Sequence, residues 1–278
     1  MTSTAHREPN VSVAVPNGPL TVLPAADITD EPVRLSLVLP TYNESGNVAE
    51  LVGRLARRLD AALEVGYEII VIDDDSPDGT FEVALGLAAE FPRLRVMRRR
   101  HERGLATAVV RGWQVARGEV LAVMDADLQH PPELAPALYA EIDRGADLAI
   151  ASRYGRGRVG QRSVGRRLRS RVAQLIGLVL LPDVLGRVSD PMSGYFMVRR
   201  SAIVGIELAP CGYKILIEIL GRGRCARISE LAYVFQERRA GRSKDSSRVY
   251  FEYLLHLLRL RSSGQGCAGR GHSASFRH

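Results

Sequence analysis

Residues 35–80 read LSLVLPTYNESGNVAELVGRLARRLDAALEVGYEIIVIDDDSPDGT, and this stretch decides the fold. The apolar run at 35–39 ends at Pro40 and predicts a buried strand. Apolar residues at helical spacing over 47–63 predict an amphipathic helix, and a second apolar run, 68–72, stops at an acidic loop. Strand, helix and strand in this order indicate a parallel crossover unit.

The same alternation continues along the chain. The pattern predicts helices at about 80–90, 104–116 and 139–144, with strands near 94–97, 120–124 and 147–151. Beyond them it predicts a helix at 211–220, a strand at 227–235 and a strongly apolar helix at 249–260. The fold class is therefore α/β with a mostly parallel central sheet, and ligands of such sheets bind where the strands end.

Composition divides the chain into four parts. Residues 1–32 are rich in Pro, Ala, Thr and Asn without periodicity, which predicts a disordered leader. One large folded domain is predicted over 33–245, followed by an amphipathic helix over 246–261. Residues 262–278 are heavy in Ser and Gly and are predicted to be a disordered tail.

The charge of the chain limits its partners. A formal net charge of +7 over 278 residues favours anionic partners such as nucleic acid, phosphosugars or acidic lipid headgroups. Nucleic acid is disfavoured, because the arginine-rich stretch 153–171 contains one aromatic residue, Tyr154, to stack on bases. No apolar stretch approaches the roughly 20 residues of a membrane span, so any membrane contact is expected to be peripheral.

Two acidic loops follow predicted strands. Asp125 and Asp127 end the strand at 120–124, and Asp73 and Asp74 end the strand at 68–72. Carboxylates two residues apart can jointly face Mg²⁺ or Mn²⁺, with a diphosphate supplying further ligands. The alternative is that such residues only cap the next helix. Because both loops are expected at one sheet edge, their repulsion favours a cation or ligand there. His130 is expected to pack or to hydrogen-bond near the Asp125–Asp127 loop rather than to ligate the metal.

Several motifs together resemble a known family. PTYNE at 40–44, VIDDDSPDGT at 71–80 and MDADLQHPP at 124–132 resemble the family-2 glycosyltransferases with the GT-A (Rossmann-like) nucleotide-sugar-binding fold. The nearest branch is that of dolichol-phosphate mannose synthase and its bacterial polyprenyl-phosphate relatives. The resemblance extends through SRY at 152–154, DPMSGY at 190–195, GYK at 212–214 with Glu218, and residues 238–244.

The resemblance implies roles for particular residues. It implies metal binding by Asp125 and Asp127, with Asp127, Arg153 and Gln129 at the catalytic centre. It implies contacts to the nucleotide sugar or to phosphate from Pro40, Tyr42, Glu44, Val71, Asp73, Ala126, Arg167, Lys214, Arg238 and Lys244. Arg166 is an alternative to Arg167. Lys214 and Lys244 are the only lysines of the chain, and both fall on motif positions.

The implied activity is inverting transfer of mannose from GDP-mannose to a polyprenyl (dolichyl-type) phosphate. The alternatives are transfer of glucose or N-acetylglucosamine from a UDP donor to the same acceptor, and a non-enzymatic nucleic-acid-binding role. A catalytically inactive subunit is disfavoured because both metal carboxylates are present.

A lipid acceptor implies a place at the membrane. We expect a cytoplasmic protein bound peripherally to the cytoplasmic membrane face, directly or through a separate membrane-anchoring subunit. Eight arginines in 153–171 precede an apolar run at 172–181, which predicts an interfacial helix. Residues 249–260 are expected to be either a second interfacial helix or a helix buried against the sheet.

Overall fold

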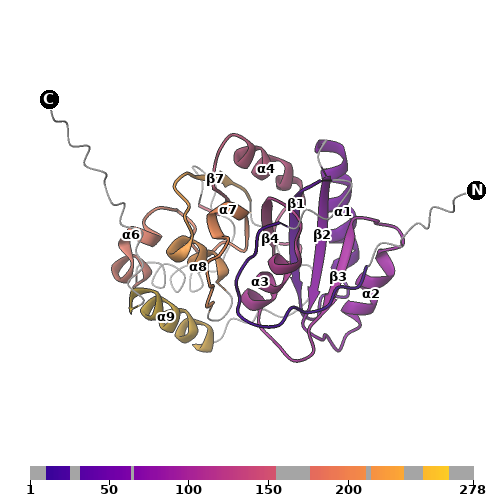
Figure 1. The fold of residues 1–278 in the computed structure, drawn as a ribbon, viewed down its shortest axis with the longest axis horizontal. Helices are drawn as coiled ribbons and strands as arrows, with labels where there is room; N and C mark the ends of the chain where they lie inside the picture. Colours follow the sequence, from indigo (N-terminus) through magenta and orange to yellow (C-terminus); the bar gives the residue numbers. More distant parts are fainter. Residues whose placement is uncertain are drawn as a thin grey trace, which may run out of the picture.

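A computed structural model describes residues 11–25, 32–63, 66–154, 176–210, 214–234 and 247–262. Their centre is a seven-stranded sheet with the order β3-β2-β1-β4-β6-β5-β7 (Figure 1). The strands are β1 (Val33–Thr41), β2 (Gly66–Asp73), β3 (Leu94–Arg98), β4 (Val120–Met124), β5 (Leu148–Ser152), β6 (Tyr195–Arg199) and β7 (Ile228–Ala232). The helices are α1 (Val48–Ala62), α2 (Thr80–Leu87), α3 (Leu105–Val115), η1 (Pro132–Leu134), α4 (Ala135–Asp143), α6 (Pro182–Leu185), α7 (Arg200–Ile203), α8 (Ile215–Arg222) and α9 (Ser247–Ser262).

The sheet is mostly parallel, which confirms the predicted α/β class. β1 pairs in parallel with both β2 and β4, β2 with β3, and β5 with β7. β6 alone runs antiparallel to its neighbours β4 and β5. Its first residue, Tyr195, therefore lies opposite Met124, the last residue of β4.

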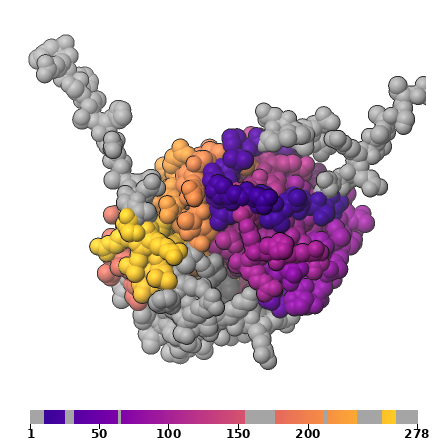
Figure 2. All heavy atoms as spheres, turned by 60° about the horizontal axis from the view of Figure 1, so that its bottom comes forward, coloured from indigo at the N-terminus to yellow at the C-terminus, as the bar shows by residue number. Residues whose placement is uncertain are grey.

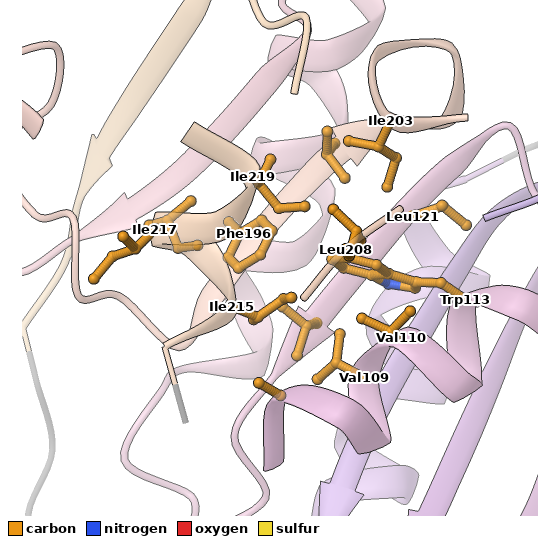
Figure 3. Close-up of a cluster of buried hydrophobic side chains, with 14 of the residues drawn as sticks. Val109, Val110, Trp113, Leu121, Phe196, Ile203, Leu208, Ile215, Ile217 and Ile219 are labelled. Carbon is orange, nitrogen blue, oxygen red and sulfur yellow. The ribbon is translucent and has the colours of Figure 1, made fainter. Parts of the chain in front are cut away.

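The two faces of the sheet carry separate cores. Along β1, Leu35, Leu37 and Leu39 face a core shared with α1 and α4, and Val38 faces the other core. That second core contains Trp113 of α3, which meets Phe196 edge to face at 6.1 Å, and Ile215, Ile217 and Ile219 of α8 (Figure 3). Gly112 lets α3 approach β1 closely, because a Cβ there would lie 2.8 Å from the Val38 methyl groups.

Helix α9 belongs to this second core. Tyr253, Leu257 and Leu260 are buried, and Leu260 lies over Gly221 of α8. His256 Nε2 lies 2.7 Å from Glu218 Oε2, and both residues are buried. These contacts favour the buried alternative for the inner face of α9, which Figure 1 shows beside α6 and α8. Among the residues described, no helix combines the length and the hydropathy needed to cross a membrane.

Residues 11–25, here called the strap, differ from the predicted disordered leader. Val96 N donates to Val11 O at 2.8 Å and Val13 N donates to Val96 O at 2.8 Å, so the strap pairs with edge strand β3. It then crosses α3 and forms bridges with Val204 and Glu207 beyond α7. Figure 2 shows it lying along the molecular surface. Its order comes from backbone pairing with distant residues, which leaves no periodicity in the sequence.

Substitutions at two neighbouring strap positions test whether the strap stabilises the domain. Val22 is fully buried, whereas Leu23 is 60% exposed. We expect Val22→Ala to destabilise by about 2 kcal/mol through lost burial, lowering the melting temperature by roughly 4–8 °C. Leu23→Ala is the matched control and should melt like the wild type. Equal melting of Val22→Ala and the wild type would contradict a stabilising strap.

A second pair of substitutions tests the packing of α9. Leu257 is fully buried and Leu258 is 45% exposed. Leu257→Ala should lower the free energy of unfolding by about 2–5 kcal/mol, because it leaves a cavity. Leu258→Ala should change it by less than about 0.5 kcal/mol. Denaturant titration measures both values, and similar small effects would mean that α9 does not pack in the core.

Candidate active site

The loop after β2 is built around Asp73. Its buried carboxylate accepts hydrogen bonds from Thr41 Oγ1 at 3.1 Å, from Ser76 N at 2.8 Å and from Ser76 Oγ at 2.5 Å. Because Thr41 ends β1 and is the register partner of Asp73, these bonds join the ends of two parallel strands. Asp73 therefore shapes the edge of the sheet at which ligands of such folds bind.

The other nucleoside candidates lie around Asp73 with different exposure. Pro40 is in β1, opposite Ile72, and Tyr42 and Glu44 follow in the loop after it. Arg103 lies over the Tyr42 ring at 5.6 Å from its centroid. The side chain of Val71 is fully buried in the core beneath the sheet and is not exposed at the loops.

Two further acids of this loop pair with arginines of the protein. Asp74 accepts hydrogen bonds from Arg99 Nε and from Gly104 N, both at 2.7 Å. Asp75 accepts one from Arg98 Nε at 2.6 Å. Arginines at the end of β3 and just after it therefore pair with Asp74 and Asp75, so the charges of these two residues do not by themselves require a cation.

Asp125 and Asp127 lie just beyond β4, beside β1. Asp125 N donates to Gly194 O at 3.2 Å, and a Cβ at position 194 would collide with the Asp125 carboxylate. Asp127 is buried and its Oδ1 accepts from Gln129 N at 3.1 Å. Ala126, between the two acids, is also buried. The side chain of Asp125 is 33% exposed, which leaves its carboxylate accessible to a ligand.

Basic groups converge on Asp125. Burial by itself would raise the pKa of Asp125, but His130, Lys214 and Arg153 outweigh it and hold the pKa below its ordinary value. Lys214 Nζ donates to Met192 O at 3.0 Å, which fixes the ammonium beside the 189–194 loop. Asp125 is therefore ionised at neutral pH, as a metal ligand must be.

Arg153 is held by a carboxylate that the sequence reasoning did not assign. Its Nε donates to Asp190 Oδ2 at 2.7 Å and its Nη2 to Asp190 Oδ1 at 2.6 Å. Asp190 N and Ser189 N in turn donate to Glu230 of β7. Burial would lower the pKa of Arg153, but Asp190 raises it, so the guanidinium stays charged. Asp190 is the first residue of the DPMSGY motif at 190–195, and the family resemblance implied no role for it.

Other candidates fall outside this cluster. Arg167, Arg238 and Lys244, like the alternative Arg166, lie outside the described residues. Glu218 is described, and it is fully buried between His256, Arg222 and Ala209 N. Its role is to join α8 to α9.

The donor set at the β4 edge suits a hard divalent cation. Within the described ranges, no group of three or more His, Cys, Asp or Glu side chains is arranged to hold a metal. Asp125 and Asp127 supply carboxylate oxygens only. Two carboxylates, with water and phosphate oxygens in the remaining positions, fit the preferences of Mg²⁺ and Mn²⁺.

Removing the charge of Asp190 tests how Arg153 is held. Burial by itself would raise the pKa of Asp190. The hydrogen bonds and the charge of Arg153 outweigh burial and hold the pKa below its ordinary value of 3.8. Asp190→Asn should cost about 3 kcal/mol at pH 7, because it leaves a buried guanidinium without its charged partner.

The pH dependence of that cost follows from the lowered pKa. The stabilisation by Asp190 is complete above about pH 4 and is lost as the pH falls through the lowered pKa. Denaturant titrations of the wild type and of Asp190→Asn should therefore converge in acid. A difference that is independent of pH would contradict the ion pair.

Comparison with known proteins gives one family and one fold. The family model described as Glycosyl transferase family 2 matches residues 36–204. The chain is 44% identical over 229 residues to a dolichol-phosphate mannosyltransferase of Pyrococcus furiosus, covering 82% of this chain and 64% of that protein. It is 33% identical to the Saccharomyces cerevisiae dolichol-phosphate mannosyltransferase, over 82% of this chain and 87% of that protein. It is 37% identical to the polyprenol monophosphomannose synthase of Mycolicibacterium smegmatis, over 86% of this chain and 91% of that protein.

Solved structures resemble the chain in fold. The crystal structure of glucosyl-3-phosphoglycerate synthase from Mycobacterium tuberculosis with Mn²⁺, UDP and glucosyl-3-phosphoglycerate aligns with a TM-score of 0.63 at 21% identity, covering 85% of this chain and 82% of that chain. Mannosyl-3-phosphoglycerate synthase from Rubrobacter xylanophilus aligns with a TM-score of 0.63 at 22% identity, covering 88% and 80%. These likenesses bear out the GT-A fold.

Proposed function

The chain belongs to glycosyl transferase family 2, and from this premise we propose that it transfers mannose from GDP-mannose to a polyprenyl phosphate. The observation that carries the proposal is 44% identity over 82% of the chain to a protein named for this reaction. The match spans 64% of that relative's length, which is less than two thirds. The cluster around Asp125 supports the same activity.

The acceptor explains why the site is rich in cations. A phosphate monoester has its second pKa near 6, so it is mostly ionised at neutral pH and needs no strong general base. The protein must instead bring two anionic groups together and align the acceptor oxygen opposite the leaving diphosphate. Arg153 and Lys214, which both act on Asp125, supply positive charge for this task. Attack from the side opposite the diphosphate inverts the sugar carbon.

The donor would lie along the edge of β1, β2 and β4. We assign the nucleoside to Pro40, Tyr42, Glu44 and Asp73, which surround the end of β1, and the sugar diphosphate to the vicinity of Gln129. Asp125 and Asp127 would hold Mg²⁺ or Mn²⁺, which when bound neutralises the charge that builds on the leaving diphosphate. Arg167, Arg238 and Lys244 complete the proposed phosphate contacts.

A lipid acceptor places the working enzyme at a membrane surface. The helical residues 176–180 pack on α9, since a Cβ on Gly177 would collide with the Tyr253 hydroxyl. Ile176 and Val179 of this helix, and Leu254 and Leu258 of α9, are exposed apolar residues. With the arginines of 153–171, they support peripheral binding at the cytoplasmic face, directly or with an anchoring subunit.

The test is transfer of radiolabelled sugar to a short polyprenyl phosphate, with GDP-mannose or UDP-glucose as donor and with or without Mn²⁺. We expect metal-dependent mannosyl lipid from the wild type. Asp127→Ala should lower the rate by at least about 100-fold, on the scale of losing one electrostatic catalytic group. Asp143→Ala, which removes an exposed carboxylate of α4, is the control and should keep full activity.

The outcomes separate the alternatives. Glucosyl lipid from UDP-glucose would retain the mechanism and replace the donor. Undiminished transfer by Asp127→Ala at saturating Mn²⁺ would contradict the metal assignment. Absence of lipid product from either donor, with vesicles included, would contradict the proposed acceptor.

A further inference from the structure

Three aromatic side chains pack behind the Asp125 carboxylate. His130 follows β4, Tyr195 begins β6 and Tyr233 follows β7, so three separate segments bring them together. All three are buried. The His130 ring meets the Tyr195 ring edge to face at 5.7 Å and lies 5.4 Å from the Tyr233 ring. This packing fixes the plane of the imidazole.

The two nitrogens of His130 face different partners. Nδ1 lies 2.8 Å from the Tyr233 hydroxyl, and Nε2 lies 3.6 Å from Asp125 Oδ2. The second distance is too long for a hydrogen bond as it stands, and a shift of under 1 Å would form one. A carboxylate only accepts, so attraction at Nε2 requires a proton there. Nδ1 of the neutral ring then accepts from the Tyr233 hydroxyl.

Tyr233 is itself held by the sheet. Tyr233 N donates to Ser152 O at 3.1 Å, which continues the pairing of β7 with β5 by one residue. The neighbouring residue, Arg153, is the one clamped by Asp190. The hydroxyl that selects the histidine tautomer is therefore placed by main-chain pairing, which holds a functional side chain more accurately than a loop does.

We propose that Tyr233 and His130 are positioning residues that orient Asp125 as a ligand for the divalent cation. This inference rests on the metal site of the proposed function. Asp125 Oδ2 lies 3.6 Å from His130 Nε2, and the whole carboxylate lies against Gly194, where a Cβ would collide with both of its oxygens. Residues that hydrogen-bond to a metal-ligating carboxylate orient it and so affect metal affinity. Loss of such a residue typically weakens metal binding about 10- to 100-fold.

The first test measures Mn²⁺ affinity by electron paramagnetic resonance of the free ion in the presence of GDP. Tyr233→Phe removes only the hydroxyl and should weaken Mn²⁺ binding by about 10-fold. His130→Leu should weaken it at least as much, and His130→Gln, which keeps an N–H donor near the Nε2 position, should recover part of the loss. Melting curves of each variant report its folding separately from metal affinity.

Tyr67→Phe is the matched control. Tyr67 is buried like Tyr233, and its hydroxyl donates to Oδ1 of Asp60, a residue of α1, at 2.7 Å. This variant should lose stability and bind Mn²⁺ like the wild type. Equal Mn²⁺ affinity of Tyr233→Phe and the wild type would overturn the positioning role alone. Failure of the wild type to bind Mn²⁺ would overturn the metal site and this inference with it.

A second test uses the unaltered protein. The ¹⁵N chemical shifts of the His130 ring distinguish the two neutral tautomers. We expect the proton on Nε2 in the wild type and a change of tautomer population in Tyr233→Phe. A proton on Nδ1 in the wild type would overturn the inference even if the His130 variants fail to fold.

Discussion

The site depends on one constraint of topology, the reversed direction of β6. In a wholly parallel sheet, the segment that precedes a strand lies at the edge opposite the ligand loops. Because β6 is antiparallel, its first residue lies opposite the last residue of β4. The loop at 189–194 is thereby brought against Asp125, and it carries with it Asp190, Gly194 and the carbonyl that binds Lys214.

Electrostatic compensation then decides which acids remain for a ligand. Asp74 and Asp75 are bound by Arg99 and Arg98, and Asp190 is bound by Arg153. The Arg99–Asp74 and Arg153–Asp190 pairs are buried. Buried pairs add little net stability, but breaking one is costly, so these two hold a unique loop arrangement. Asp125 differs from these residues. Its side chain is a third exposed, as is that of Asp75, but the cations that lower its pKa have other partners: Arg153 donates to Asp190, and Lys214 donates to Met192 O.

The sequence allowed prediction of features that repeat or alternate over short distances. The strands at 35–39, 68–72 and 120–124 and the acidic residues that end them could be identified, because apolar runs and turn residues are local signals. The apolar helix at 249–260 was recognised, but whether it faces the core required the Glu218 contact of His256.

Features that depend on distant partners could not be predicted. Val22 and the strap owe their order to backbone pairing with β3 and with residues beyond α7. Asp190 lies 37 residues from Arg153, and Tyr233 lies 103 residues from His130. Neither pair has a spacing that marks it. The reversed strand β6 was likewise absent from the predictions, since an apolar run carries no direction.

The most direct measurement is anomalous X-ray diffraction from crystals of the protein grown with Mn²⁺ and GDP-mannose. The predicted result is one strong manganese peak bridging the carboxylates of Asp125 and Asp127, with the diphosphate bound to it and the guanosine beside Tyr42 and Asp73. A nucleotide bound at this edge without manganese at Asp125 and Asp127, or manganese bound elsewhere, would contradict a metal-dependent glycosyltransferase site.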